Sequence, residues 1–207
     1  MITIIDNFLN NPQELIVEAK NNFKIDSLCI QQKNYPGIKV FPKPTTKKFI
    51  ENKIKKISLI ETACDEMEYQ FVNKSFLTGI PHEDLPKSFT FIIFLHPCPK
   101  KSSGIELYKK FNEFPSTKII NLNYLNEMLK KKEKFFSSKN KSFFERLEYR
   151  KTVRTVQKEL EKYCTPLIVN NVFNRLVIFD SSIIHRPQNY FGNDESDSRL
   201  NLVGFFK

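Results

Sequence analysis

The chain has 207 residues, a net charge of +10, and 40% hydrophobic residues. This hydrophobic content excludes an intrinsically disordered chain, and the presence of only 5 glycines excludes a collagen-like or glycine-rich linker protein. The length suits one domain with a sizeable core. We expect residues 1–207 to form a single domain that carries a basic helical insertion at about 110–164.

The first third of the chain predicts one strand and two helices. Residues 2–5 are apolar and suit a short strand, and Asn11 and Pro12 suit the start of a helix that runs to about Phe23. A proline-rich and glycine-containing loop follows. A second helix is expected at 46–67, because apolar residues recur there at helical spacing.

The remainder of the chain alternates between strand and helix patterns. Tyr149, Val153, Val156 and Leu160 are spaced by four and three residues, which indicates an amphipathic helix. The expected strands cover 69–77, 88–95, 104–108, 166–170, 175–180 and 199–206, and the segment 116–163 is expected to be helical.

Two groups of strands that share one core, separated by a helical insertion, favour a particular fold class. We expect an α+β fold with a mainly β core. The favoured form is a double-stranded β-helix (a cupin-like jelly roll) with the N-terminal helices packed on its sheet. Periodicity alone does not distinguish this fold from other α+β folds.

Positive charge is concentrated in the expected insertion. Residues 109–164 contain 15 Lys and Arg but 7 Glu and no Asp. Such a segment suits an acidic partner such as nucleic acid. The whole chain, however, has 27 Lys against 6 Arg and abundant Asn, Ile and Phe, which is typical of AT-rich codons. We favour this compositional explanation of the charge.

The cysteines and the N-terminus bear on the cellular compartment. No two of the 4 cysteines form a C-x-x-C pair, which argues against a zinc ribbon or a redox dithiol. The first residues lack the basic segment and long apolar core of a signal peptide, and no apolar run approaches the ~18 residues that a membrane span needs. We therefore expect a cytoplasmic protein with free thiols and no membrane partner.

Two potential metal ligands lie close together in the segment GIPHEDLPK. If this segment is extended, His82 and Asp84 point to the same side, because side chains alternate along a strand. One imidazole and one carboxylate make up two-thirds of the facial triad of non-haem Fe(II) oxygenases. The alternative is that His82 caps a turn and Asp84 is solvated.

A triad needs a second histidine, and two candidates remain. His185 follows the strand expected at 175–180 and is the better placed of the two. His96 forms an H-x-C pair with Cys98, which suits a soft metal but lacks further ligands. The alternative role of His185 is that of a surface or capping histidine.

Arg199 opens a final strand whose two faces are both largely apolar. An arginine buried on such a strand needs an anionic partner. That partner could be a protein carboxylate such as Asp180. It could equally be a ligand carboxylate, which arginine binds through two parallel hydrogen bonds. Asn201 lies two residues further along, on the same face of the strand.

The spacing of these residues resembles a known family. The H-x-D pair, a distal His185 and Arg199 fourteen residues later resemble the Fe(II)/2-oxoglutarate-dependent oxygenases, most closely the prolyl-4-hydroxylase-like subgroup. The segments IIDNFLNNPQELIVEA, FTFIIFLHPCPKKSSGIELY and NRLVIFDSSIIHRP also look like parts of that group. The resemblance spans roughly 1–23, 69–108 and 166–207, and it leaves the basic insertion unexplained.

The resemblance implies a role for each matching residue. His82, Asp84 and His185 would hold Fe(II), while Arg199, supported by Asn201, would bind the far carboxylate of 2-oxoglutarate. The implied activity is that of a dioxygenase that uses 2-oxoglutarate and O2, with ascorbate as an optional addition. Its primary substrate would be a peptidyl or free amino acid, in a protein or alone, or a small metabolite that it hydroxylates.

One position departs from the family pattern. The group usually has a tyrosine on the strand after H-x-D that helps to bind 2-oxoglutarate, and here the equivalent residue is Phe94. Tyr69 or Tyr108 could supply the missing hydroxyl. The presence of Asp84 argues against the halogenating branch of the family, in which that carboxylate is absent.

Three other functions remain as alternatives. A nucleic-acid-acting oxygenase could use the basic insertion, but such enzymes typically carry a second arginine where this chain has Phe205. A catalytically inactive jelly-roll protein could serve in binding or assembly. A zinc hydrolase could use two histidines and a carboxylate, but it leaves Arg199 without a role. Its only general-base candidate, Glu83, should point away from the metal.

Overall fold

The computed structural model describes residues 1–24, 29–30, 37–74, 76, 79, 81–110, 143–162, 164–194 and 196–207. Within these residues the chain forms ten strands, three α-helices and one short 3-10 helix. The strands are β1 (Ile2–Ile5), β2 (Cys29–Ile30), β3 (Ile38–Val40), β4 (Cys64–Val72), β5 (Phe89–Phe94), β6 (Ile105–Lys110), β7 (Leu167–Val169), β8 (Leu176–Asp180), β9 (Ile183–Pro187) and β10 (Arg199–Phe206). The helices are α1 (Pro12–Phe23), α2 (Pro44–Ser58), η2 (Lys101–Ser103) and α4 (Phe143–Glu161).

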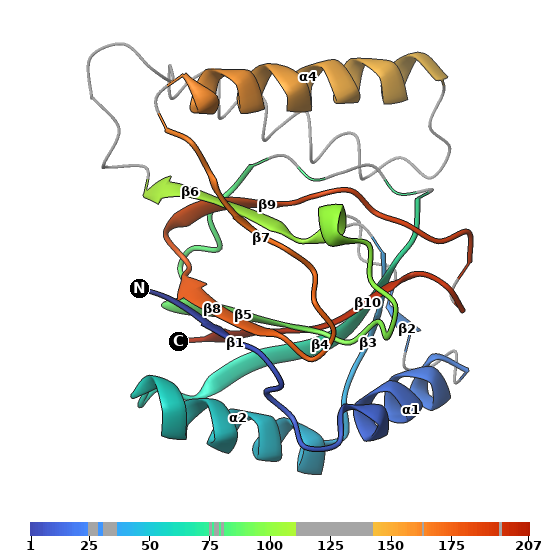
Figure 1. Ribbon diagram of the computed structural model, residues 1–207, viewed down its shortest axis with the longest axis vertical. Coiled ribbons are helices and arrows are strands. Elements are labelled where there is room, and N and C mark those ends of the chain that lie inside the picture. The colour runs from blue at the N-terminus through green and yellow to red at the C-terminus, as the bar shows by residue number, and fades with distance from the viewer. Residues whose placement is uncertain are drawn as a thin grey trace.

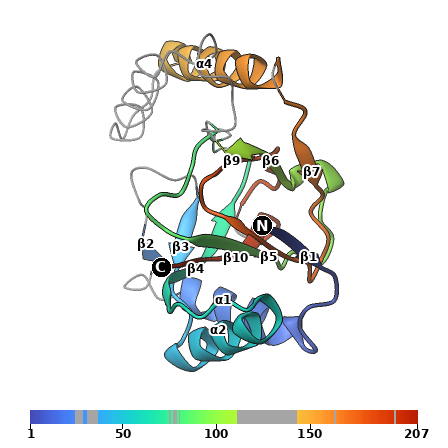
Figure 2. The same ribbon diagram turned by 90° about the vertical axis from the view of Figure 1, so that its left-hand side faces the viewer.

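The strands form two antiparallel sheets. The larger sheet has the order β1-β8-β5-β10-β4-β3-β2, and the smaller one has the order β7-β6-β9. Helices α1 and α2 cover the outer face of the larger sheet, while α4 lies beyond the smaller sheet on the opposite side (Figures 1 and 2). The expectation of an α+β fold with a mainly β core is confirmed at this level.

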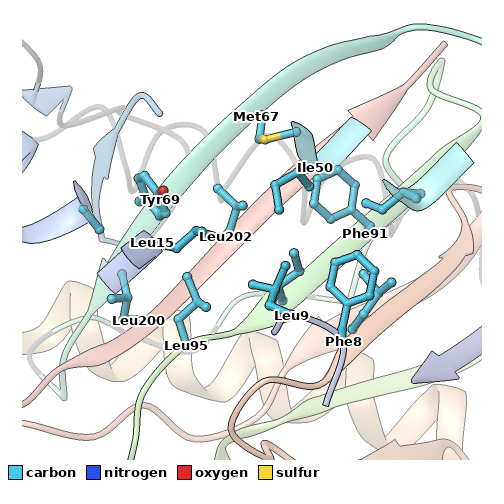
Figure 3. Packing of buried hydrophobic residues seen from close by; sticks show 14 of the residues in the cluster. Phe8, Leu9, Leu15, Ile50, Met67, Tyr69, Phe91, Leu95, Leu200 and Leu202 are labelled. Carbon is cyan, nitrogen blue, oxygen red and sulfur yellow. The ribbon is translucent and has the colours of Figure 1, made fainter. Parts of the chain in front are cut away.

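Two apolar clusters hold these layers together. The first joins α1 and α2 to the larger sheet and includes Ile50, Tyr69 and Leu202 (Figure 3). The second fills the space between the two sheets and includes Phe94, Leu107 and Phe179. Central strand β10 contributes to both clusters, so it is covered on both faces, as its two apolar faces predicted.

The expected second helix extends too far in sequence. Helix α2 ends at Ser58 because Leu59 adopts a left-handed conformation with φ 57°, and Cys64 and Met67 belong to β4. Residue Asp65 is extra in the pairing with β10, so Cys64 and Met67 face the same side although they are three residues apart. A β-bulge therefore produced the spacing that had indicated a helix.

Other expectations concern the loops and the insertion. The loop expected between the N-terminal helices contains β3, which pairs with β4. His185, expected to follow the strand at 175–180, lies on a separate strand, β9. Of the insertion expected at about 110–164, α4 is described, and its Tyr149 and Val153 are buried as the periodicity predicted. Residues 111–142 lie outside the described residues. No helix in the described part of the chain combines the length and apolar character of a membrane span.

Packing of α2 on the larger sheet should contribute substantially to stability. Ile50 is fully buried in the first apolar cluster, whereas its neighbour Phe49 is 54% exposed. We expect Ile50→Ala to lower the free energy of unfolding by about 2–4 kcal/mol, because the substitution leaves a cavity. Phe49→Ala should change it by less than about 0.5 kcal/mol. Urea unfolding of both variants tests this assignment, and equal losses would contradict it.

Candidate metal centre

Backbone pairing brings the H-x-D segment to β9. The N–H of His82 donates to the carbonyl of His185, and the N–H of His185 donates back to His82, each at 2.9 Å. The N–H of Asp84 donates to the carbonyl of Ser181 at 2.9 Å. Residues 82–84 therefore lie alongside the strand that carries His185, although about a hundred residues separate them in sequence.

The three side chains converge on a small space. The Asp84 carboxylate oxygens lie 3.2 Å from His185 Nε2 and 3.6 Å from His82 Nε2. The three potential ligand atoms all lie within 4.8 Å of one another. Ligands bound at ~2.1 Å to adjacent positions of one metal ion lie about 3 Å apart. The arrangement is therefore close to what a single ion requires, and small side-chain movements would complete it.

The hydrogen bonding of His185 supports a metal-binding role. Its Nδ1 lies 2.9 Å from the carbonyl oxygen of Ile183, which can only accept, so Nδ1 carries a proton. Nε2 of His185 faces the Asp84 carboxylate at 3.2 Å, where it can bind a metal ion when the ring is neutral or donate to the carboxylate when the ring is protonated. A backbone acceptor on the remote nitrogen is the usual support of a metal-binding histidine.

Asp84 is held as an anion. Burial alone raises the pKa of this carboxyl, but the imidazoles of His185 and His82 and a hydrogen bond from Thr90 outweigh that effect and hold the pKa well below its usual range. The Thr90 hydroxyl donates to Asp84 Oδ2 at 2.8 Å and lies 2.9 Å from the Ser181 hydroxyl. Thr90 and Ser181 therefore fix the carboxylate as a second layer around the candidate site.

Arg199 faces the space between the sheets. It is 2% exposed, and its neighbour Asn201 binds it when the amide is oriented so that the oxygen accepts from Arg199 Nε at 3.0 Å and Nη2 at 3.2 Å. The third guanidinium nitrogen, Nη1, is buried and has no hydrogen-bond partner among the described residues. Asp180, the protein carboxylate considered as a partner, instead accepts hydrogen bonds from Ser182. A buried cation with an unsatisfied donor suits an anionic ligand.

Two aromatic rings flank the guanidinium. Its central carbon lies 5.6 Å from the ring centroid of Phe94 and 5.7 Å from that of Tyr190. Burial lowers the pKa of Arg199 to about 10, so the group stays cationic at neutral pH. Burial also raises the pKa of Tyr190, whose hydroxyl oxygen accepts a hydrogen bond from the Gly79 N–H. The Tyr190 hydroxyl therefore keeps its proton at neutral pH.

Tyr190 was missed by the sequence reasoning, which considered Tyr69 and Tyr108. Tyr69 pairs with Leu202 and lies in the helix-covered cluster, where its hydroxyl is 3.4 Å from Glu18. Tyr108 donates to Glu106 at 2.8 Å on the outer face of the smaller sheet. Both hydroxyls face away from Arg199, because side chains alternate along a strand. Tyr190 lies in the loop after β9, where no periodic pattern indicates which way a side chain points.

The other candidate ligands lie apart from this cluster. His96 Nδ1 accepts a hydrogen bond from the Cys98 N–H at 3.2 Å, and the His96 ring packs edge-on against Phe191. The described residues contain one group of three potential ligands, His82, Asp84 and His185, and Glu83 is not in it. His96 and Cys98 are not part of that group.

Comparison with solved structures places the fold in a known class. The chain is similar to a Pseudomonas putida prolyl-4-hydroxylase, with a TM-score of 0.51 and 10% identity over 100% of this chain and 91% of that one. It is similar to SnoK, a non-heme alpha-ketoglutarate-dependent carbocyclase from nogalamycin biosynthesis, with a TM-score of 0.58 and 10% identity over 100% of this chain and 79% of that one. It also resembles HygX from Streptomyces hygroscopicus, solved with nickel, 2-oxoglutarate and hygromycin B, with a TM-score of 0.56 and 7% identity over 99% of this chain and 82% of that one. At these identities the likeness shows the fold alone.

The family itself follows from the sequence match. Residues 1–206 match the model of a family of unknown function, DUF6445, and the chain belongs to that family. No curated protein sequence matches the chain. The family supplies no activity, so any function has to be argued from the site.

Metal binding tests the site directly. We expect His185→Ala to weaken the binding of Co(II) or Ni(II), used as stable substitutes for Fe(II), by about 100-fold or more, because one of three ligands is lost. Thr90→Val should weaken it by about 10-fold through the loss of support for Asp84. Isothermal titration calorimetry measures both effects.

The third histidine provides the matched control for these variants. His96→Ala should leave the metal affinity unchanged, since His96 contacts Cys98 and Phe191. If His96→Ala weakens binding as much as His185→Ala does, the metal lies elsewhere.

Proposed function

We propose that this protein is a non-haem Fe(II)- and 2-oxoglutarate-dependent dioxygenase of the prolyl-4-hydroxylase-like kind, with its two sheets forming a jelly roll in one domain. The observation that carries the proposal is a His–Asp–His cluster together with a buried arginine that has an unsatisfied donor, Arg199 Nη1. The similarity to prolyl-4-hydroxylase, SnoK and HygX supports it at the level of fold.

The residues of the cluster fit a ferrous ion. Two imidazole nitrogens and one carboxylate on one side of an ion form the ligand set of non-haem Fe(II) oxygenases, and they leave positions on the other side open. Bound Fe(II) would supply oxygen activation coupled to the conversion of 2-oxoglutarate to succinate and carbon dioxide. The contribution of the chain is to hold His82, Asp84 and His185 in place and to keep Asp84 ionised.

The residues around Arg199 fit the far carboxylate of 2-oxoglutarate. Nη1 would donate to that carboxylate, while Asn201 holds the other side of the guanidinium. We assign the family's missing tyrosine hydroxyl to Tyr190, which lies on the guanidinium and keeps its proton. Phe94, on the remaining side, contributes an apolar wall that keeps the carboxylate away from water.

The proposed reaction is hydroxylation of a peptidyl or free amino acid or of a small metabolite. The similarity to a prolyl-4-hydroxylase and to a structure solved with hygromycin B bound supports these two substrate classes. A nucleic-acid-acting oxygenase gains no support from the site, since the position of the second arginine is occupied by Phe205, a partly buried residue packed between the sheets.

Binding of 2-oxoglutarate tests the arginine. In the Ni(II)-loaded protein, Arg199→Gln should weaken 2-oxoglutarate binding by about 100-fold, because the buried charge that pairs with the carboxylate is removed. Tyr190→Phe should weaken it by about 10-fold through the loss of one hydrogen bond. Titration calorimetry with 2-oxoglutarate measures the affinities, and normal binding by Arg199→Gln would rule out this pocket.

Two controls separate ligand binding from a structural role. Arg175→Gln removes a charge that pairs with Asp6 at the surface, so it should leave the 2-oxoglutarate affinity unchanged. Arg199→Gln should also leave the unfolding free energy of the ligand-free protein unchanged or raise it, because an unpaired buried charge is removed. A large loss of stability would instead assign Arg199 a structural role.

Catalytic competence is tested by succinate release. When oxygen is admitted to anaerobically Fe(II)-loaded protein with 2-oxoglutarate and a panel of amino acids and proline-containing peptides, we expect succinate to form above the level of the His185→Ala variant. Mass spectrometry of the panel would identify a product heavier by one oxygen atom. A wild-type protein that binds metal and 2-oxoglutarate but releases no succinate and forms no oxygenated product would support the alternative of an inactive binding protein.

A further inference from the structure

We propose that a pocket between α4 and the outer face of the smaller sheet binds a phosphate group, either inorganic or carried by a small molecule. The α4 pocket, as we name it, has a volume of about 270 Å³. Helix α4 contributes Arg150 and Arg154 to its lining, and the strand side contributes Glu106 and Arg186. Helix α4 lies over β6 and β9 in both views of the molecule (Figures 1 and 2). This proposal does not depend on the oxygenase activity.

The α4 pocket is separate from the candidate metal centre. On β6, Leu107 belongs to the cluster between the sheets, and it pairs with His185 of β9. Because side chains alternate along a strand, the neighbouring pair of Glu106 and Arg186 lies on the opposite face. Adjacent residues of β9, His185 and Arg186, therefore serve two different sites on the two faces of the same sheet.

The floor of the α4 pocket is an ion pair without spare negative charge. Arg186 donates from Nε to Glu106 Oε2 at 2.6 Å and from Nη2 to Oε1 at 3.0 Å. The Tyr108 hydroxyl donates to the same Oε2 at 2.8 Å. Glu106 is therefore neutralised by Arg186 and is not available to neutralise the arginines of α4.

The two α4 arginines that line the pocket have no acidic partner among the described residues. The side chains of Arg150 and Arg154 form no hydrogen bond or ion pair with any described residue, and both are exposed at the rim of the pocket. They lie one helical turn apart, a spacing at which like charges destabilise a helix by a few tenths of a kcal/mol. An anion bound between the two arginines would attract both of them and offset this repulsion. Three guanidinium groups thus surround one cavity, and Glu106, the single carboxylate among its described lining residues, is already paired with Arg186.

The chemistry and size of the pocket select the class of ligand. Guanidinium groups bind phosphate through paired hydrogen bonds, and several of them suit its double negative charge. The volume lies just below the ~300–1,000 Å³ of pockets for drug-sized ligands, so it admits a phosphate with a short carbon body. Tyr149 and Val153 form an apolar side of the pocket for that body. A nucleic-acid strand would instead need an open groove with several aromatic platforms.

Binding of phosphate compounds tests the proposal. Inorganic phosphate and glycerol 3-phosphate are titrated separately into the protein by calorimetry in phosphate-free buffer. We expect saturable binding that is weakened about tenfold or more in the double variant Arg150→Ala/Arg154→Ala. Tighter binding of glycerol 3-phosphate would indicate a phosphorylated metabolite, and equal binding would indicate inorganic phosphate; either supports the site.

A charge-matched variant of the same helix provides the control. Lys151→Ala/Lys158→Ala also removes two exposed positive charges from α4, but these residues do not line the pocket. Its affinity for phosphate should stay within about twofold of the wild type. Alanine favours helix at these exposed positions, so both double variants should fold, as circular dichroism would verify.

Three outcomes would overturn the proposal. The first is a wild-type protein without saturable binding of either compound at millimolar concentration. The second is an equal loss of affinity in the two double variants, which would indicate diffuse charge. The third is a single-stranded oligonucleotide that binds through Arg150 and Arg154 and is not displaced by glycerol 3-phosphate, which would indicate a nucleic-acid surface instead.

Discussion

The candidate site depends on one pair of backbone hydrogen bonds between His82 and His185. Each residue donates to the carbonyl of the other at 2.9 Å, which fixes the H-x-D segment beside β9. Side-chain direction then follows from the extended backbone, and both imidazoles reach the Asp84 carboxylate. A shift of this pairing by one residue would turn His82 and Asp84 to the opposite face, so the strand register determines whether a metal can bind.

Arg199 sets a second constraint on the interior. It lies on β10, the strand that both apolar clusters cover, and it is buried without a carboxylate partner in the described residues. Burying an unpaired guanidinium costs several kcal/mol, and Asn201, Phe94 and Tyr190 offset only a part of that cost. The folded state tolerates this cost because the packing of the surrounding sheets contributes more stabilising free energy than the buried charge removes. Binding of a carboxylate to the guanidinium would lower the free energy further.

The two faces of the smaller sheet present opposite chemistry. Toward the larger sheet, β9 presents His185, whose neighbours include the Asp84 carboxylate and the ring of Phe179. Toward α4 it presents Arg186, within a cavity lined by three arginines. One residue of offset along a strand thus separates a site suited to a cation from a site suited to an anion. Part of the positive charge of the expected insertion is concentrated at this cavity, because Arg150 and Arg154 both line it.

The sequence by itself determined the α+β class, the start of α1 at Pro12 and the buried final strand, because local periodicity and composition carry this information. It also singled out His82, Asp84, His185 and Arg199 as candidates. Only the tertiary structure decided that the first three meet, since contacts between distant segments depend on strand register. The bulge at Asp65, the tyrosine beside Arg199 and the cavity under α4 were likewise decided there. Each depends on how separate elements pack, and no local pattern in the chain records that packing.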